Sequence, residues 1–312
     1  MTEMPAHQTV LYAEALEQLA IKPDGTYLDC TFGRGGHSRG ILAGLDESGR
    51  LLALDRDADA IASPEAEKLR QDPRFELHHA SFAELAAVVG RKGYAGKIDG
   101  ILMDLGVSSP QLDIAERGFS FLRDGPLDMR MDTGRGMSAA DYLARVEENE
   151  LVRILFEYGD ERFAKRIARA IVSQRQQAPI TTTLALARLI EHSVPFRDKH
   201  KHPATRSFQA IRIEVNQELE QIKAGLQQAL DTLAPGGRLV VISFHSLEDR
   251  IVKRFIRDQS GAKTDPGKLP VREQDIEQGQ LRKIGKSIRA QAQELRNNPR
   301  ARSAVMRVAE KR

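Results

Sequence analysis

The chain has 312 residues, of which 41% are hydrophobic and 29% are charged, and its formal net charge is +3. This composition excludes collagen-like, coiled-coil and intrinsically disordered proteins, and the length corresponds to one large domain or two. Cys30 is the only cysteine, which excludes an intramolecular disulfide and any zinc or iron–sulfur site built from cysteines. The longest apolar runs are far shorter than the roughly 20 residues of a membrane-spanning helix, so a cytoplasmic protein is expected.

Positive charge is concentrated in two segments. Residues 282–312 carry ten lysines and arginines against two acids, a local net charge of +8, which leaves −5 for the rest of the chain. Residues 197–206 combine four lysines or arginines with two histidines and one acid. Such clusters are typical of proteins that bind polyanions, although a solvated surface explains either segment alone equally well.

The first third of the chain alternates between short apolar segments and helical patterns. Strands are predicted at residues 27–32, 50–55, 75–78 and 98–104, and helices at residues 34–45 and 58–71. Two of these strands end in an acid, Asp55 and Asp104. Alternation at this spacing is typical of βαβ units, which build a parallel sheet.

This regularity ends after the fourth predicted strand. Residues 106–136 have the Gly, Pro and Asp content of a loop, and residues 138–193 have a helical pattern without a strand candidate. Further strands are predicted at residues 210–215, 238–243 and 304–309, and further helices at residues 217–233 and 247–257. The simplest interpretation is one α/β sheet whose sequence is interrupted by a helical insertion.

The loop after the first predicted strand is rich in glycine, with Gly33, Gly35 and Gly36. Glycine is needed where a cofactor comes close to the backbone, because a Cβ would collide and because positive φ is accessible to glycine without strain. A dinucleotide-binding loop would have another glycine at position 38, where this chain has Ser38, and no P-loop motif is present. Asp55, at the end of the next strand, can accept hydrogen bonds from both hydroxyls of a ribose. The combination favours a nucleoside cofactor over a loop that serves packing alone.

Six motifs in order along the chain carry a resemblance to a known family. They are Asp29-x-Thr-x-Gly-x-Gly-Gly-His37, Leu54-Asp55-Arg-Asp57, Asp104-Leu-Gly-Val-Ser-Ser-Pro-Gln111, Arg117-Gly-Phe-Ser-Phe-x-x-x-Gly-Pro-Leu-Asp-Met-Arg-Met131, His202-Pro-Ala-Thr-Arg-Ser-Phe-Gln-Ala-Ile-Arg212 and Ile242-Ser-Phe-His-Ser-Leu-Glu-Asp-Arg250. With these motifs the chain closely resembles, over essentially its whole length, the bacterial ribosomal RNA small subunit methyltransferase H family, also called MraW.

The resemblance implies an enzyme that uses S-adenosylmethionine to methylate the exocyclic N4 of a decoding-centre (P-site) cytidine in 16S rRNA, within the 30S subunit. It implies the class I methyltransferase fold, a Rossmann-like α/β sheet of seven strands with an antiparallel last strand and an inserted helical domain. The expected methyltransferase domain comprises residues 1–112 and 210–312, the latter with the basic C-terminal segment, and the inserted substrate-recognition domain comprises residues 113–209. Neither a membrane nor an obligate protein partner is expected. No metal site is expected, because His37 lacks a second ligand set at metal-binding spacing.

The resemblance also assigns residues to the cofactor and to catalysis. Cofactor binding is predicted for Gly33, Gly35, Gly36, His37, Asp55, Phe82, Asp104 and Gln111. Asp55 is expected at the ribose, and Phe82 offers a flat apolar face to the adenine. Asp104 is the candidate catalytic residue, because a hydrogen-bond acceptor can orient the cytosine amine and take or relay its proton. Base amino-methyltransferases generally continue with Pro-Pro-aromatic here, whereas Leu105 follows in this chain, so a role of Asp104 toward the cofactor is the alternative.

RNA contacts are predicted in and beside the insertion. The predicted residues are Lys199, Lys201, Arg206, Arg212, Phe119, Phe121 and Tyr142. The cations would hold phosphates and the rings would stack on splayed bases. For each ring taken singly, packing in the protein core is the alternative.

Three other protein classes remain as alternatives. A nicotinamide dehydrogenase would share the fold but would have glycine at position 38. A non-catalytic RNA-binding protein would explain the basic C-terminal segment but not the polar features at the strand ends. A DNA or protein methyltransferase would use the same cofactor, and the family resemblance alone favours rRNA over these substrates.

Overall fold

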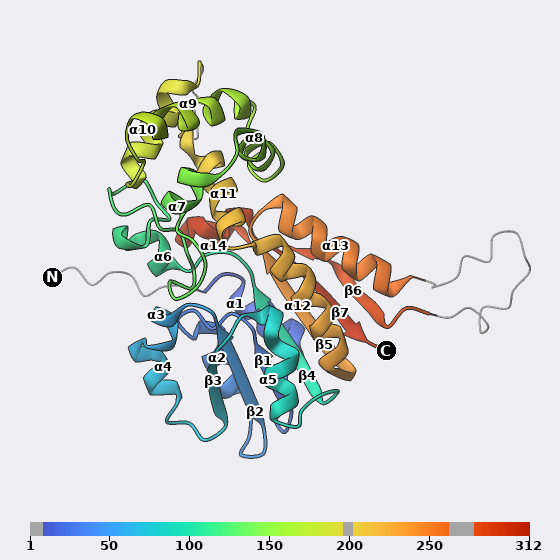
Figure 1. Ribbon diagram of the computed structural model, residues 1–312. Coiled ribbons are helices and arrows are strands. Elements are labelled where there is room, and N and C mark those ends of the chain that lie inside the picture. Colours follow the sequence, from blue (N-terminus) through green and yellow to red (C-terminus); the bar gives the residue numbers. More distant parts are fainter. Residues whose placement is uncertain (1–8, 196–201, 262–277) are drawn as a thin grey trace, which may run out of the picture. The chain divides into compact units, whose positions relative to one another are not determined.

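The structure is a computed structural model that describes residues 9–195, 202–261 and 278–312 (Figure 1). The chain forms two compact units. The first contains the residues up to Gly106 and those from Leu219 onward, and the second is Val107–Glu218. Within the described ranges, no helix has the length and apolar character that crossing a membrane requires.

The first unit contains a seven-stranded sheet with the strand order β3-β2-β1-β4-β5-β7-β6. Its strands are β1 (Thr26–Asp29), β2 (Arg50–Asp55), β3 (Phe75–His79), β4 (Ile98–Asp104), β5 (Leu233–Ser243), β6 (Leu281–Ile288) and β7 (Val305–Lys311). Strands β1 to β5 are parallel, whereas β7 lies between β5 and β6 and is antiparallel to both. The predicted seven-stranded α/β sheet with an antiparallel last strand is therefore confirmed.

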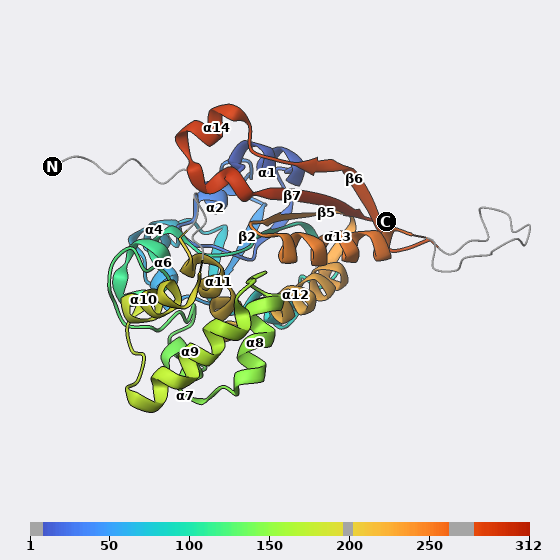
Figure 2. The ribbon, with the colours of Figure 1, turned by 90° about the horizontal axis from the view of Figure 1, so that it is seen from above.

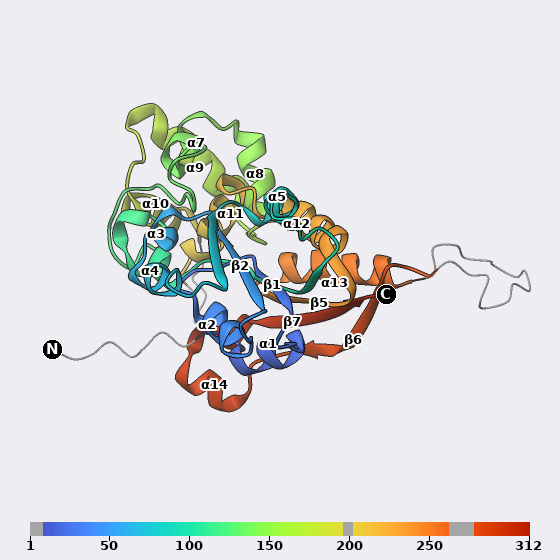
Figure 3. The same cartoon turned by 90° about the horizontal axis from the view of Figure 1, so that it is seen from below.

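Helices cover both faces of this sheet. They are α1 (Tyr12–Leu19), α2 (Gly36–Ala43), α3 (Ala58–Ile61), α4 (Pro64–Leu69), α5 (Leu85–Arg91), α12 (Glu218–Thr232), α13 (Ser246–Ser260) and α14 (Ala292–Asn297). Figures 2 and 3 show α1, α2 and α14 on one face and α5, α12 and α13 on the other. Parallel strands covered on both faces must be apolar throughout, and Ile101, Leu102 and Met103 of β4 are accordingly fully buried.

The second unit is helical. Its helices are α6 (Ser109–Asp113), α7 (Ala139–Arg145), α8 (Glu148–Glu157), α9 (Ala164–Gln177), α10 (Thr183–Ser193) and α11 (Ala204–Val215). These helices bury a core of their own, in which Leu151, Ile154, Ile167 and Ile190 are fully inaccessible to solvent. The helical pattern predicted for residues 138–193 is confirmed.

The strand predicted at residues 210–215 is wrong, because these residues are the second half of α11. Ala204, Phe208 and Ile211 lie four and three residues apart and are all buried, which is the spacing of one helix face. The alternation of the isoleucines matches a strand, but the segment is too short to distinguish the two-residue period of a strand from the 3.6-residue period of a helix. Because α11 belongs to the second unit as a whole, the domain boundary predicted at residue 209 falls inside a helix.

Two further differences concern the first unit. Residues 58–71 form α3 and α4 rather than one helix, because Ser63 caps α4 through a hydrogen bond from Ala66 N and Pro64 starts that helix. Strand β6 was not predicted. Five of its eight residues are exposed, since it is the last strand of the sheet and lacks the apolar pattern of a buried strand.

Candidate active site

The glycine-rich loop connects β1 to α2. Gly33 and Gly35 have φ values of 55° and 67°, in the left-handed region that favours glycine. A Cβ on Gly33 would meet no atom within 4 Å, so the space beside this residue is open to a ligand. Gly36 differs, because a Cβ there would lie 1.9 Å from Thr9 Oγ1, and close packing within the chain explains this glycine.

Asp29 fixes the conformation of this loop. It is fully buried, and its Oδ2 accepts a hydrogen bond of 2.6 Å from Ser38 Oγ, while Oδ1 accepts one of 3.1 Å from Thr31 N. Thr31 Oγ1 in turn accepts a hydrogen bond of 2.7 Å from the backbone N–H of Asp104, which connects the loop to the end of β4. Ser38, the departure from a dinucleotide-binding pattern, therefore has a defined structural partner. Asp29 and Thr31 are not among the predicted site residues, although an acid that ends an apolar strand is a detectable signal in the sequence.

Asp55 lies beside Gly33 at the end of β2, as the sequence predicts. Its Oδ2 accepts a hydrogen bond of 2.7 Å from Gly33 N, and its Oδ1 accepts one of 2.8 Å from Asp57 N. Burial, reinforced by the negative charges of Asp57 and Asp29, raises the pKa of Asp55 to about 6. Each carboxylate oxygen can accept a second hydrogen bond. Asp55 can therefore hold the loop and the two hydroxyls of a ribose at the same time.

Phe82 begins a 3-10 turn, Phe82–Glu84, after β3. The turn follows Ala80, whose N–H donates to the backbone oxygen of Asp55 at 3.0 Å. The Phe82 ring packs against α12, since a Cβ on Gly225 would lie 2.6 Å from its Cδ2. The ring is half-buried, and its contact with an adenine stays a prediction.

Asp104 ends β4, next to β1 in the sheet. Its Oδ2 lies 3.7 Å from His37 Nδ1, and its Oδ1 is buried without a hydrogen-bond partner among the described residues. Burial and the negative charges of Asp29 and Glu248 raise the pKa of Asp104 well above its usual value. Burial lowers the pKa of His37 to about 4, so this imidazole is neutral at pH 7. A buried acceptor without a partner, at the carboxyl ends of parallel strands, is suited to a donor on a ligand.

Glu248 is another buried carboxylate at this edge, and it is not among the predicted site residues. It accepts hydrogen bonds from Phe244 N at 2.7 Å and from His245 N at 3.2 Å, at the start of α13. Its Oε1 lies 3.0 Å from His245 Nε2. The three-residue spacing of His245 and Glu248 is that of a helix-capping pair, which was the signal available in the sequence.

The rings predicted to bind RNA lie in the second unit. Phe119 is only 6% exposed, and the Arg117 guanidinium lies over it, 5.8 Å from the ring centroid. Phe121 is half-buried and meets the edge of Phe208 at a centroid distance of 4.8 Å. Tyr142 is also half-buried, and burial raises the pKa of its hydroxyl. Little of Phe119 is therefore available for stacking, whereas Phe121 and Tyr142 retain some exposed surface.

Two of the predicted phosphate-binding residues are engaged within the second unit. Arg206 is half-buried and donates from Nη1 to the backbone oxygen of Asp160 at 2.8 Å. Arg212 forms two hydrogen bonds of 2.8 Å with the carboxylate of Glu218. Lys199 and Lys201 lie outside the described residues. Arg212 therefore has a structural role, and RNA binding by these four residues stays a prediction.

Gln111, the remaining residue assigned to the cofactor, also belongs to the second unit. It is 4% exposed, and its Oε1 accepts a hydrogen bond of 2.9 Å from Ser108 N. This contact completes the N-terminal cap of α6. Gln111 thus has a local structural role, and its contact with the cofactor stays a prediction.

Comparison with known proteins identifies the family. The sequence matches the MraW methylase family over residues 4–312. The chain belongs to the MraW methylase family. This methylase is 58% identical over 306 residues to Ribosomal RNA small subunit methyltransferase H of Alteromonas mediterranea, a match that covers 98% of this chain and 97% of the relative. It is 56% identical over 312 residues to the protein of that name from Pseudoalteromonas atlantica, covering 100% of both chains. A solved structure of a putative rRNA-methylase from Clostridium thermocellum has 11% identity and a TM-score of 0.46, covering 98% of this chain and 100% of that one.

The strand order and the antiparallel β7 are those expected of a class I methyltransferase. A methylase needs a methyl donor, and S-adenosylmethionine is the predicted cofactor. The residues of the first unit fit this group. The open space beside Gly33 admits a ligand close to the backbone, and the Asp55 carboxylate has acceptor capacity for the ribose hydroxyls. S-adenosylmethionine carries no phosphate, which agrees with a loop that lacks the P-loop pattern.

We expect Gly33→Ala to weaken S-adenosylmethionine binding by about tenfold or more, because a Cβ would enter the open space and strain a backbone with φ 55°. Gly93→Ala is the matched control, since Gly93 also has positive φ and open space around it but lies in the loop after α5. Calorimetry and thermal melting of both variants separate affinity from stability. Equal affinities of the two variants would exclude a cofactor contact at Gly33.

Proposed function

We propose that this methylase transfers the methyl group of S-adenosylmethionine to the exocyclic N4 of a decoding-centre (P-site) cytidine in the 16S rRNA of the small ribosomal subunit. The family and the names of the relatives support ribosomal RNA as the substrate. The observation that supports this chemistry is the buried Oδ1 of Asp104, which has no hydrogen-bond partner among the described residues and lies at the sheet edge with Gly33 and Asp55.

Methyl transfer from a sulfonium is an in-line displacement, in which the new N–C bond forms as the S–C bond breaks. Bound S-adenosylmethionine supplies the electrophilic methyl group. The protein has to hold the donor, align the amine with the S–C bond and exclude water. Gly33 and Asp55 would hold the donor, through the open space beside the Gly33 backbone and the acceptor capacity of Asp55 for the ribose hydroxyls.

Asp104 acts on the amine. The lone pair of the cytosine amine is delocalised into the ring, which makes the nitrogen a weak nucleophile. A hydrogen bond from the amine to Asp104 favours pyramidal geometry at nitrogen, and the same carboxylate takes the proton that the methylated amine loses. The raised pKa of Asp104 makes it a better proton acceptor than an exposed aspartate, and neutral His37 does not oppose this transfer with a positive charge.

RNA recognition is assigned to the second unit. The target cytidine must leave its stack to reach the donor, and exposed rings and cations hold such splayed nucleotides. Phe121, Tyr142 and Arg206 retain exposed surface for this role. Phe119 and Arg212 are retained as weaker candidates, because one is buried and the other is paired with Glu218.

The identity of the acceptor molecule tests this proposal against a DNA or protein methyltransferase with the same cofactor site. The enzyme is incubated with radiolabelled S-adenosylmethionine and, separately, with unmodified 30S subunits, naked 16S rRNA, DNA or protein. We expect label in 30S subunits or 16S rRNA alone. Label confined to DNA or protein would overturn the proposal.

A further inference from the structure

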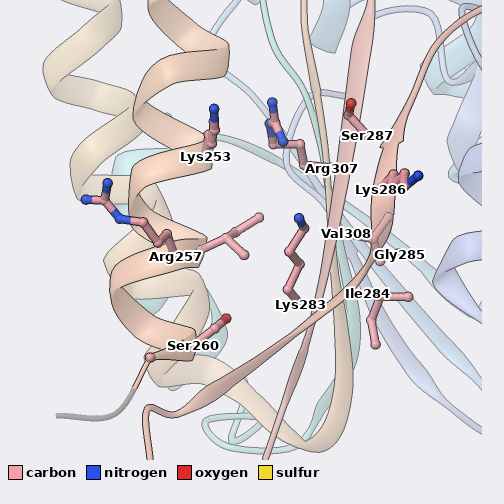
Figure 4. Close-up of a pocket in the computed structure, with 12 residues that line it drawn as sticks. Lys253, Arg257, Ser260, Lys283, Ile284, Gly285, Lys286, Ser287, Arg307 and Val308 are labelled. Atoms are coloured by element: carbon pink, nitrogen blue, oxygen red, sulfur yellow. The ribbon is translucent and has the colours of Figure 1, made fainter. Parts of the chain in front are cut away.

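A hollow of about 300 Å³ lies in the first unit between α13 and the strands β6 and β7 (Figure 4). Its apolar part consists of Ile256 on α13, Ile284 on β6 and Val308 on β7. None of the residues that line it belongs to the glycine-rich loop or to the strand ends with Asp55 and Asp104. The hollow is therefore separate from the cofactor site, and its volume is at the lower end of the range of small-ligand pockets.

An irregularity of β6 forms this hollow. Ile284 pairs with Val308 and Ile288 pairs with Met306, so β6 uses four residue steps where β7 uses two. Gly285 stands in the interrupted stretch with φ 58°. A bulge of this kind bends the strand and redirects its side chains. Beside α13, β6 therefore departs from regular pairing with β7, and a space remains between the helix and the strands.

Positively charged side chains line this space, and among them only Arg257 and Arg307 have an acidic partner in the part of the chain that the structure describes. Lys253 on α13 and Lys283 on β6 are exposed, and neither has an ion pair or side-chain hydrogen bond among the described residues. Arg307 is held by two hydrogen bonds, of 2.7 and 2.9 Å, to Asp249. Figure 4 shows Lys283 in the space between α13 and the strands, with Lys253 and Arg307 beside it, whereas Lys286 is directed outward.

Protection of the sheet edge is the simpler explanation for the lysines of β6. Lysines on an exposed edge strand prevent pairing with other chains, and this accounts for Lys283 and Lys286. It does not account for Lys253, which is on a helix, nor for an apolar surface recessed between cations. Cations around an apolar recess match a ligand that combines a negative charge with a flat apolar ring, and a nucleotide is such a ligand.

We propose that this hollow is a second RNA-binding surface, which receives an unstacked nucleotide of the rRNA. Lys253 and Lys283 hold the phosphate, and the base lies against Ile256, Ile284 and Val308. The inference rests on the proposed function, because it takes RNA to be the substrate. A second contact on the same RNA raises the effective concentration of the target nucleotide without touching the reacting atoms. It therefore acts on substrate binding and not on methyl transfer.

The test is the double variant Lys253→Glu/Lys283→Glu, measured with unmodified 30S subunits and with naked 16S rRNA. Loss of this phosphate contact lowers the magnitude of the salt slope of RNA binding by about 0.7 and weakens RNA binding roughly 10-fold at 0.1 M salt. We expect KM for the RNA substrate to rise in proportion, with kcat and S-adenosylmethionine affinity unchanged. The matched control is the double variant Arg91→Glu/Lys97→Glu, which makes the same change of charge on two exposed residues shortly before β4 that do not line the hollow. We expect it to retain the parental KM and salt slope.

The outcomes separate this inference from the proposed function. A wild-type enzyme that methylates no RNA refutes the proposed function. A wild-type enzyme that methylates rRNA, together with a folded double variant of parental salt slope and KM, refutes the second surface alone. Loss of affinity for 30S subunits with unchanged affinity for naked 16S rRNA also refutes it, because the partner of the hollow would then be a ribosomal protein.

Discussion

Asp104→Asn is expected to lower the single-turnover rate of methyl transfer by about 100-fold or more, the usual contribution of a positioned acid–base group. The substitution keeps the size of the side chain and one acceptor oxygen but removes the charge that takes the amine proton. S-adenosylmethionine affinity should fall only modestly, because the ribose contacts are predicted for Asp55 and not for Asp104. Single-turnover methylation and calorimetry on the same preparation measure the two effects. If the two losses are equal, Asp104 binds the cofactor and another group serves the base.

The pH dependence gives an independent check on Asp104. Its pKa is raised well above the usual value, mainly by burial, so the carboxylate is protonated at a higher pH than an exposed aspartate. The ionised form is the reactive one, so the rate should rise with pH through the raised pKa and then level off. Asp104→Asn should lose this rising limb. A rising limb that persists unchanged in the asparagine variant would assign it to a different group.

Asp55→Ala is expected to weaken S-adenosylmethionine binding at least about tenfold. Each hydrogen bond from a ribose hydroxyl to the charged carboxylate contributes roughly 1.5 to 3 kcal/mol, and the alanine variant loses both. It also loses the contacts with Gly33 N and Asp57 N that hold the loop. Calorimetry on a variant shown to be folded measures the change, and unchanged affinity would contradict the ribose assignment.

The same residue predicts a pH effect on binding. Because the pKa of Asp55 is raised to about 6, the cofactor-free protein protonates this carboxyl as the pH falls through that value. Protonation removes acceptor capacity, so wild-type affinity should decrease below about pH 6. Asp55→Ala should lack this component of the pH dependence, so a comparison of the variant with the wild type assigns the component to Asp55.

Much of the sheet and part of the site could be predicted from the sequence, and the reasons are physical. Residues 98–104 are mostly apolar and end in an acid, which defines β4 and Asp104 without knowledge of their neighbours. The proximity of Gly33 and Asp55 follows because the carboxyl ends of adjacent parallel strands meet at one edge. Local sequence patterns are therefore sufficient to predict these strands and the residues at their ends.

The remaining features depend on contacts that local patterns do not contain. Residues 210–215 alternate like a strand, and only packing in the second unit shows them to be helical. Strand β6 forms because β7 offers it a partner, although its own residues are mostly exposed. The hydrogen bond from Ser38 to Asp29 joins residues nine positions apart across a loop. The sequence alone therefore shows only that position 38 is not the glycine of a dinucleotide-binding loop.

The nucleoside that receives the methyl group is the most direct measurement of the proposed activity. Unmodified 30S subunits are incubated with the enzyme and labelled S-adenosylmethionine, and the 16S rRNA is isolated, digested to nucleosides and separated by chromatography with mass detection. We predict that the label elutes with N4-methylcytidine, that one position in the decoding centre carries it, and that Asp104→Asn abolishes most of the signal. Label in a base methylated at carbon, in a ribose-methylated nucleoside or in a nucleoside other than cytidine would contradict the assignment of Asp104 to a cytosine amine.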